Sequence, residues 1–316
     1  MSNPRLRRAL KWGLPPILIL LFAAYLTIAY LMASGVTKAE RKPQDDTPSA
    51  HALAFHDVTF PTRGGDIQLS GWHITNHGTV RPTIIFVHGL DSVRSAKNSL
   101  DIASRLSALG YDSLLFDLRA HGSSGDGRLS GGYFERMDVL GAYDYLRQHG
   151  VPSESIGLLG FSMGAATAIM ATADEPSIHA VVADSSFANA EDLIGQEMAR
   201  KTPFPKWSAG ILMPTAKLFA SQLYEIDLAK ASPVKAIVRI NYPVFLIHGD
   251  ADTRIPYDHS TRLQKASPQS TLWLVDGVDH VDSFTTYPEE YMLHITSYFD
   301  AMLKVTAESP EPHQHE

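Results

Sequence analysis

The fold is decided by Ser155-Ile156-Gly157-Leu158-Leu159-Gly160-Phe161-Ser162-Met163-Gly164-Ala165-Ala166. A short apolar run leads into the pattern Gly-x-Ser-x-Gly, and small residues follow, so the stretch predicts a β-strand, a sharp turn and an α-helix. Glycine suits positions 160 and 164 because a Cβ there would crowd a strained turn that presents the Ser162 hydroxyl. The alternative is an ordinary tight turn of an α/β protein, so the function depends on what the rest of the chain supplies.

Composition limits the classes of protein to consider. The chain has 316 residues, with 44% hydrophobic and 19% charged residues, which is ordinary for one large globular domain. Its formal net charge is −7 although four basic residues precede residue 12, so the remainder is still more acidic. This charge disfavours nucleic acid as a partner. The chain has no cysteine, which excludes disulfides, thiolate catalysis and cysteine-ligated zinc.

The amino terminus predicts a membrane anchor. Leu14 to Ala33 are 20 residues without a charge, and a helix of that length is about 30 Å long, the thickness of a bilayer hydrocarbon core. We predict a basic segment at residues 1–13 and a single transmembrane helix at residues 14–34, so that the lipid bilayer is a partner. The alternative is a cleaved secretory signal, but the apolar run is longer than such signals usually have, and no clean Ala-x-Ala site follows.

The flanks of this helix bear on its orientation. Four basic residues precede it and three follow it, Lys38, Arg41 and Lys42, which weakly favours a cytoplasmic amino terminus and an extracytoplasmic catalytic domain. Residues 35–52 contain prolines and several charges and are interpreted as a linker. Residues 305–316 are interpreted as a disordered tail.

Residues 53–304 alternate between strand and helix patterns. A hairpin signal around Arg63-Gly64-Gly65 predicts an antiparallel start, and the β-branched run Thr83 to Val87 is typical of a buried parallel strand. Further strand patterns fall at residues 113–116, 179–184, 241–249 and 271–275, with helical patterns between and after them. The order predicts an α/β fold with a mostly parallel, doubly wound sheet.

Residues 187–240 interrupt this alternation. They separate two predicted strands by about fifty residues and are rich in apolar and aromatic side chains, whereas a crossover needs far fewer. We predict a small helical cap that covers the site. The alternative is a long crossover that packs elsewhere on the sheet. An apolar cap favours a small or acylated substrate with an apolar group.

Polar residues at the strand ends predict a catalytic triad. In an open parallel sheet, ligands bind beyond the carboxyl ends of the strands, and a serine nucleophile needs a base and an acid, here in the chain order Ser, acid, His. Asp252 is the predicted acid because its loop follows the next-to-last strand, and Asp184 and Asp250 are the alternatives. His280 is the predicted base, since no other histidine after Asp252 directly follows a strand pattern.

The same strand ends supply groups for the developing oxyanion. We predict that the backbone amides of Leu90 and Met163 bind it, because each follows a strand end close to the nucleophile. Metal chemistry is not favoured, because neither HExxH nor a comparable ligand spacing occurs, and the run Asp279-His280-Val281-Asp282 does not supply one. No metal site is therefore predicted.

Six motifs occur in one order along the chain: His88-Gly89, Asp117-x-Arg119-x-His121-Gly122-x-Ser124, Gly160-Phe161-Ser162-Met163-Gly164, Asp184-Ser185-Ser186-Phe187, His248-Gly249-x-x-Asp252-x-x-Ile255-Pro256 and Gly277-x-x-His280. On these motifs, residues 55–303 resemble α/β-hydrolase fold serine hydrolases, and among them the membrane-anchored bacterial hydrolases allied to serine aminopeptidases and small esterases. The resemblance implies Ser162 as nucleophile, Asp252 as orienting acid, His280 as general base and no cofactor. Ala120 departs from it, since relatives usually carry glycine there, and should alter a turn without touching the triad.

The sequence therefore predicts a serine hydrolase that cleaves a carboxylic ester or related acyl bond through an acyl-enzyme. One alternative is a serine peptidase of aminopeptidase or prolyl type, which would use acidic residues to hold a substrate amino group. Another, of a different class, is a catalytically silent membrane-tethered binding protein. Fold and triad define a reaction type and leave the choice among ester, thioester and amide open.

Overall fold

The computed structural model describes residues 4–65, 67–75, 81–96, 98–201 and 205–304. The predicted tail at residues 305–316 and the first three residues of the basic segment lie outside these ranges. The chain divides into two compact units. We call residues 1–38 with 192–227 the helical unit, and residues 39–191 with 228–316 the sheet unit.

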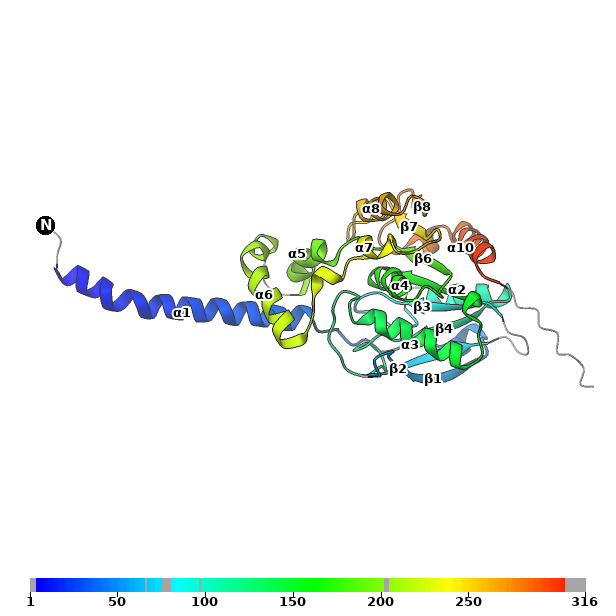
Figure 1. Ribbon diagram of the computed structural model, residues 1–316, viewed down its shortest axis with the longest axis horizontal. Coiled ribbons are helices and arrows are strands. Elements are labelled where there is room, and N and C mark those ends of the chain that lie inside the picture. The colour runs from blue at the N-terminus through cyan, green and yellow to red at the C-terminus, as the bar shows by residue number, and fades with distance from the viewer. Residues whose placement is uncertain (1–3, 66, 76–80, 97, 202–204, 305–316) are drawn as a thin grey trace, which may run out of the picture. The chain divides into compact units, whose positions relative to one another are not determined.

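The sheet unit contains an eight-stranded sheet with the strand order β1-β2-β4-β3-β5-β6-β7-β8 (Figure 1). Its strands are β1 (Phe55–Pro61), β2 (Gln68–Ile74), β3 (Thr83–Val87), β4 (Asp112–Phe116), β5 (Ile156–Phe161), β6 (Ala180–Asp184), β7 (Phe245–Gly249) and β8 (Thr271–Val275). Strand β2 is antiparallel to both β1 and β4, and every other neighbouring pair is parallel. The predicted mostly parallel α/β sheet with an antiparallel start is confirmed.

Burial explains why the central strands are continuously apolar. Every residue of β3, β4, β5, β6 and β7 is buried, as expected for parallel strands covered on both faces. The register also makes the strand ends level, because Phe161 pairs with Asp184 and Gly249 pairs with Val275. The loops that follow these strands therefore start from one edge of the sheet.

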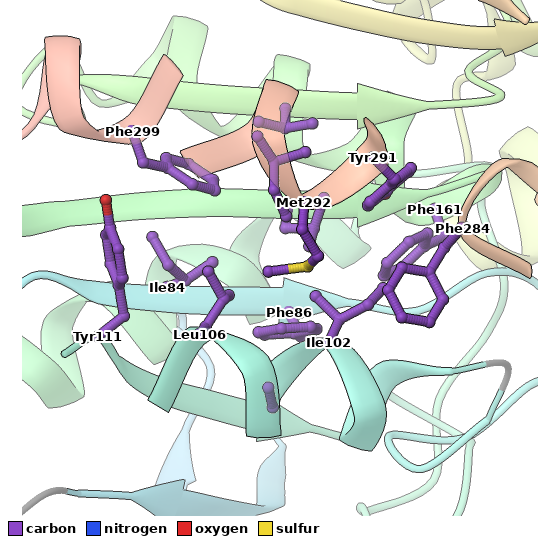
Figure 2. Packing of buried hydrophobic residues seen from close by; sticks show 14 of the residues in the cluster. Ile84, Phe86, Ile102, Leu106, Tyr111, Phe161, Phe284, Tyr291, Met292 and Phe299 are labelled. Atoms are coloured by element: carbon purple, nitrogen blue, oxygen red, sulfur yellow. The ribbon is translucent and has the colours of Figure 1, made fainter. Parts of the chain in front are cut away.

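Helices form the layers over the sheet. They are α2 (Ser99–Ala108), α3 (Glu135–Gln148), α4 (Met163–Asp174), α7 (Pro233–Ile237), α8 (Asp258–Ala266), α9 (Ser283–Thr286) and α10 (Pro288–Met302). Figure 2 shows how one layer packs: Ile102 and Leu106 of α2 and Met292 and Phe299 of α10 converge on the strands around Phe86. Helices α3, α4, α7 and α8 pack one against the next in a second group.

The helical unit contains α1 (Pro4–Val36), most of α5 (Ala190–Lys201), and α6 (Ala209–Tyr224). Residues Trp12–Val36 of α1 form a segment of 25 residues with a mean hydropathy of 2.2, long and apolar enough to cross a membrane. A signal sequence near the amino terminus has the same properties. Between β6 and β7 the described residues form helices α5, α6 and α7, and that they cap the site stays a prediction.

A matched pair of leucines tests the core. Leu106 of α2 is fully buried, whereas Leu109, just past the end of the same helix, is 61% exposed. We expect Leu106→Ala to lower the free energy of unfolding by about 2–5 kcal/mol through lost burial and the cavity left behind, and Leu109→Ala by under about 0.5 kcal/mol. Guanidinium unfolding of the full chain in detergent measures both. Equal effects would contradict the packing described here.

Candidate active site

Ser162 occupies the turn between β5 and α4 with a φ of 55° and a ψ of −120°. A positive φ is unfavourable for serine and stores strain that the surroundings must hold. The two flanking glycines make the turn possible: a Cβ at Gly164 would lie 2.0 Å from the carbonyl oxygen of Val87, and one at Gly160 would lie 2.6 Å from Cα of Ala165. The backbone therefore has no room for a side chain on either side of the serine.

The loops at the strand ends bring Ser162, Asp252 and His280 together. His280 Nε2 lies 2.9 Å from Ser162 Oγ, and His280 Nδ1 lies 2.7 Å from Asp252 Oδ2. The serine is 118 positions from the histidine in sequence and the aspartate 28. The residues that the sequence analysis singled out thus form one continuous hydrogen-bonded chain, and their catalytic roles stay a prediction.

Asp252 is held as an anion. Its Oδ1 accepts hydrogen bonds from the backbone amides of Arg254 and Ile255, at 2.9 and 2.7 Å, and its Oδ2 lies 3.2 Å from Nε2 of His248. Burial alone would raise the pKa of Asp252, but its contacts with His248 and His280 outweigh that cost and hold the pKa well below its usual range. A charged Asp252 favours a proton on Nδ1 of His280, which leaves Nε2 free to accept the serine proton.

The two alternative candidates for the acid of the triad, Asp250 and Asp184, make other contacts in the structure. Asp250 accepts a hydrogen bond from the backbone amide of Gly277 at 2.7 Å and so joins the loops after β7 and β8. Asp184 is buried and accepts hydrogen bonds from Ser185 Oγ at 2.9 Å and Tyr291 Oη at 3.2 Å. Burial raises the pKa of Asp184 to about 6. The carboxylate that contacts the imidazole of His280 is that of Asp252.

Asp184 nevertheless supports the histidine loop. Ser185 Oγ, which donates to Asp184, accepts a hydrogen bond from the backbone amide of Val281 at 3.2 Å. Val281 has a φ of 58°, an unfavourable conformation for a β-branched residue, so the contact braces a strained position next to His280. The motif Asp184-Ser185-Ser186-Phe187 indicates from sequence that these positions matter, but it does not reveal the contact with Val281.

The loop that contains Leu90 is shaped by two buried, uncharged histidines. His88 Nδ1 donates to the carbonyl oxygen of Gly89 at 2.8 Å, and His88 Nε2 accepts from the backbone amide of Leu118 at 3.0 Å. Burial lowers the pKa of His88 to about 4, which agrees with a neutral ring that both donates and accepts. His121 accepts a hydrogen bond from the amide of Asp91 at 3.3 Å. These contacts hold the loop beside Ser162.

A cavity of about 450 Å³ opens over these residues. Ser162, His280 and Leu90 line it, which is the arrangement needed if a reacting carbonyl is to reach the hydroxyl. Met163 begins α4 directly after Ser162, so its amide is one of the first-turn groups without an acceptor inside the helix. Binding of an oxyanion by the amides of Leu90 and Met163 stays a prediction.

Residues 39–46, which we call the strap, form part of the cavity wall. Lys42, Pro43 and Asp45 line the cavity together with the catalytic candidates. The strap lies within the interval interpreted from sequence as a linker, and the structure shows it making specific contacts with the sheet unit. It is therefore part of the site, and its composition gave no signal of this.

Two side chains hold the strap in place. Gln44 Nε2 donates to both carboxylate oxygens of Asp117, at 2.9 and 3.0 Å. Arg41 donates to the carbonyl oxygens of His121 and Gly122, at 3.1 and 2.7 Å. Both attachments reach the segment after β4.

The same segment contains Ala120, where the related hydrolases usually carry glycine. Ala120 has a φ of 60°, the left-handed region that glycine adopts most easily. Its amide donates to the carbonyl oxygen of Gly125 at 2.8 Å, which closes the turn. Alanine is therefore accommodated in a glycine-type turn at some conformational cost, and the triad is not involved.

No group of three or more His, Cys, Asp or Glu side chains suited to a metal ion occurs among the residues that the structure describes. The Asp279 carboxylate instead accepts a hydrogen bond from the amide of Thr253 at 2.9 Å. This contact joins the acid loop to the histidine loop and gives Asp279 a structural role.

Comparison with known proteins agrees with the fold. A protein-family model described as the alpha/beta hydrolase fold matches residues 82–232. An uncharacterised protein, YqkD, of Bacillus subtilis (strain 168) is 29% identical over 297 residues, which are 89% of this chain and 95% of that protein. A lysophosphatidylserine lipase, ABHD12, of Danio rerio is 24% identical over 63% of this chain and 50% of its own length.

Solved structures extend the comparison. The Pyrococcus furiosus esterase Pf2001 has a TM-score of 0.69 and 26% identity, covering 85% of this chain and 98% of the esterase. A Pyrococcus horikoshii acylaminoacyl peptidase, at 18% identity and a TM-score of 0.57, shares the fold over 82% of this chain. The resemblance stated from the motifs is confirmed at the level of the fold, and the esterase neighbours support hydrolase activity. This chain has the α/β-hydrolase fold and is similar over most of its length to a solved esterase of that fold.

Proposed function

We propose that this protein is a serine hydrolase that cleaves a carboxylic ester or related acyl bond through an acyl-enzyme intermediate. The observation that carries the proposal is the hydrogen-bonded chain from Asp252 through His280 to Ser162, with the serine on a strained turn facing a cavity. A neutral serine is a weak nucleophile, and this arrangement supplies the base and the orienting anion that it needs.

The first half-reaction forms the acyl-enzyme. Ser162 Oγ attacks the substrate carbonyl carbon while His280 Nε2 takes the hydroxyl proton, and Asp252 stabilises the resulting imidazolium. The amides of Leu90 and Met163 donate hydrogen bonds to the developing oxyanion. The intermediate then collapses, the bond from the carbonyl carbon to the leaving oxygen breaks, and His280 returns its proton to the departing alkoxide.

The second half-reaction regenerates the serine. Water enters, His280 Nε2 removes its proton, and the hydroxide attacks the acyl carbon on Ser162. The second tetrahedral intermediate breaks its bond to Ser162 Oγ, which recovers the proton from His280 and releases the carboxylic acid. Every step uses groups of this chain and water.

We also propose that the substrate contains an apolar group and that α1 anchors the enzyme. Leu90, Val93, Phe161 and Val281 line the cavity beside the nucleophile, which favours an acyl or alkyl chain over a hydrophilic one. Residues 14–34 would form a single-pass anchor, with the sheet unit outside the cytoplasm. The apolar length of α1 supports the anchor, and the basic residues before it support the orientation.

Covalent labelling tests the nucleophile. We expect a fluorophosphonate probe to label the full chain in detergent, because it phosphonylates an activated serine, and Ser162→Ala to lose essentially all labelling and ester turnover. Ser153→Ala, in a turn before β5, is the matched control and should label like the parent. Labelling that persists in Ser162→Ala would overturn the proposal, and a folded parent that neither labels nor turns over aryl esters would favour a silent binding protein.

The acid is tested by a pair of aspartates two positions apart. We expect Asp252→Asn to lower kcat by about 10⁴-fold, because an amide no longer favours the productive tautomer of His280. Asp250→Asn keeps an oxygen that can accept from the Gly277 amide and should leave kcat/KM within about threefold of the parent. Initial rates on a short-chain aryl ester measure both. If Asp250→Asn or Asp184→Asn were the inactivating change instead, the assignment of the acid would be wrong.

A further inference from the structure

Helix α6 packs against the second half of α1 inside the helical unit. Met32 and Ala33 of α1 and Leu212 and Ala216 of α6 are buried in one apolar cluster. Partly buried residues of both helices extend it: Tyr25, Ile28, Val36, Met213 and Phe219. The two helices therefore share a continuous apolar interface.

A polar contact fixes the same pair of helices. Tyr25 Oη lies 2.6 Å from Thr215 Oγ1 and donates to the carbonyl oxygen of Ile211 at 3.1 Å. Tyr25 belongs to the apolar segment that is long enough to cross a membrane. A hydroxyl inside hydrocarbon is costly unless it is hydrogen-bonded, and α6 supplies the partners. The contact is thus the kind that joins helices within a bilayer.

The position of this interface along α1 sets the depth of α6. The contacts on α1 run from Tyr25 to Val36, a length of about 17 Å at the rise of an α-helix. That is roughly half of a bilayer core of about 30 Å. If residues 14–34 span the membrane, α6 must lie beside the half of the span that leads into the rest of the chain.

The other face of α6 is suited to lipid. Trp207, just before the helix, is 75% exposed, and Ile211 and Leu218 are 60% and 57% exposed. Ile211 and Leu218 are seven residues apart and so fall on one face of α6, and Trp207 lies in the 3-10 turn that leads into the helix. Between Ala209 and Tyr224 the sequence has a single charged residue, Lys217. An apolar stripe of this kind, with an aromatic residue at one end, is typical of a helix in contact with a bilayer.

We infer that α6 is a second membrane element, embedded in the leaflet that holds residues 25–36 of α1, with Trp207, Ile211 and Leu218 in contact with lipid. The inference rests on the proposed anchor. The insertion between β6 and β7 would then have an interaction surface, and the partner of that surface would be the acyl chains of a bilayer. The enzyme would then be attached through two helices, and part of its insertion would lie among membrane lipids.

The absence of cysteine from the chain makes the test direct. Single-cysteine variants Ile211→Cys and Leu218→Cys on α6 are labelled with an environment-sensitive fluorophore in the full chain, reconstituted at one chain per lipid nanodisc. The lipids contain a quencher on the acyl chain. Leu293→Cys on α10, 64% exposed, is the matched control from the sheet unit, and Leu20→Cys on α1, 71% exposed, reports on the anchor.

We expect acyl-chain quencher to lower the fluorescence at positions 211, 218 and 20 at least about twofold, because contact quenching requires the label to lie among lipid chains, and to leave position 293 unchanged. Quenching at position 20 with none at 211 and 218 would overturn the inference and leave the anchor standing. No quenching at position 20 would overturn both. If the α6 labels were instead shielded only in discs that hold two chains, a second copy would be the partner, and the inference would be wrong.

Fluorophosphonate labelling of the same discs tests the proposed hydrolase activity separately from the membrane contact of α6. Labelling of Ser162 in discs where α6 is not quenched would mean that the hydrolase proposal holds and the membrane inference fails. Quenched α6 without labelling would mean the reverse.

Discussion

The structure depends on a buried carboxylate that stays charged. Asp252 loses hydration through burial, which by itself would favour the neutral acid, and two backbone amides and two histidines offset that cost. Because the anion is stabilised from four directions, it can hold His280 in one tautomer and one orientation. The 2.9 Å contact from His280 to Ser162 follows from that constraint, and with it the proposed chemistry.

The proposed nucleophile is held by a second constraint, the shape of its backbone. Ser162 has an unfavourable φ, and both flanking glycines are packed against backbone atoms that leave no room for a Cβ. Val281, next to the base, is strained in the same way and is braced through Ser185. Conformational strain thus lies at Ser162 and at the residue next to His280, and a sheet whose central strands are buried holds both.

The sequence predicted the parts of this arrangement that depend on local pattern. Buried strands appear as apolar runs, and the Gly-x-Ser-x-Gly turn and the order of motifs pointed to residues that the fold brings together. It could not predict the strap, because Gln44 meets Asp117 across 73 positions with no periodicity to mark either. The contact of Tyr25 with Thr215 could not be predicted for the same reason, since the two residues are 190 positions apart in sequence. Pairings between distant segments are set by tertiary packing, which local propensity does not encode.

The central claim is that Ser162 carries the acyl group during turnover. The most direct measurement is acid quenching of the full chain within its first turnovers of an aryl ester, followed by peptide mass mapping. We expect the added acyl mass on the peptide that contains Ser162, accumulating in a burst before steady state. Turnover with no acyl adduct there, or with the adduct on another residue, would contradict it.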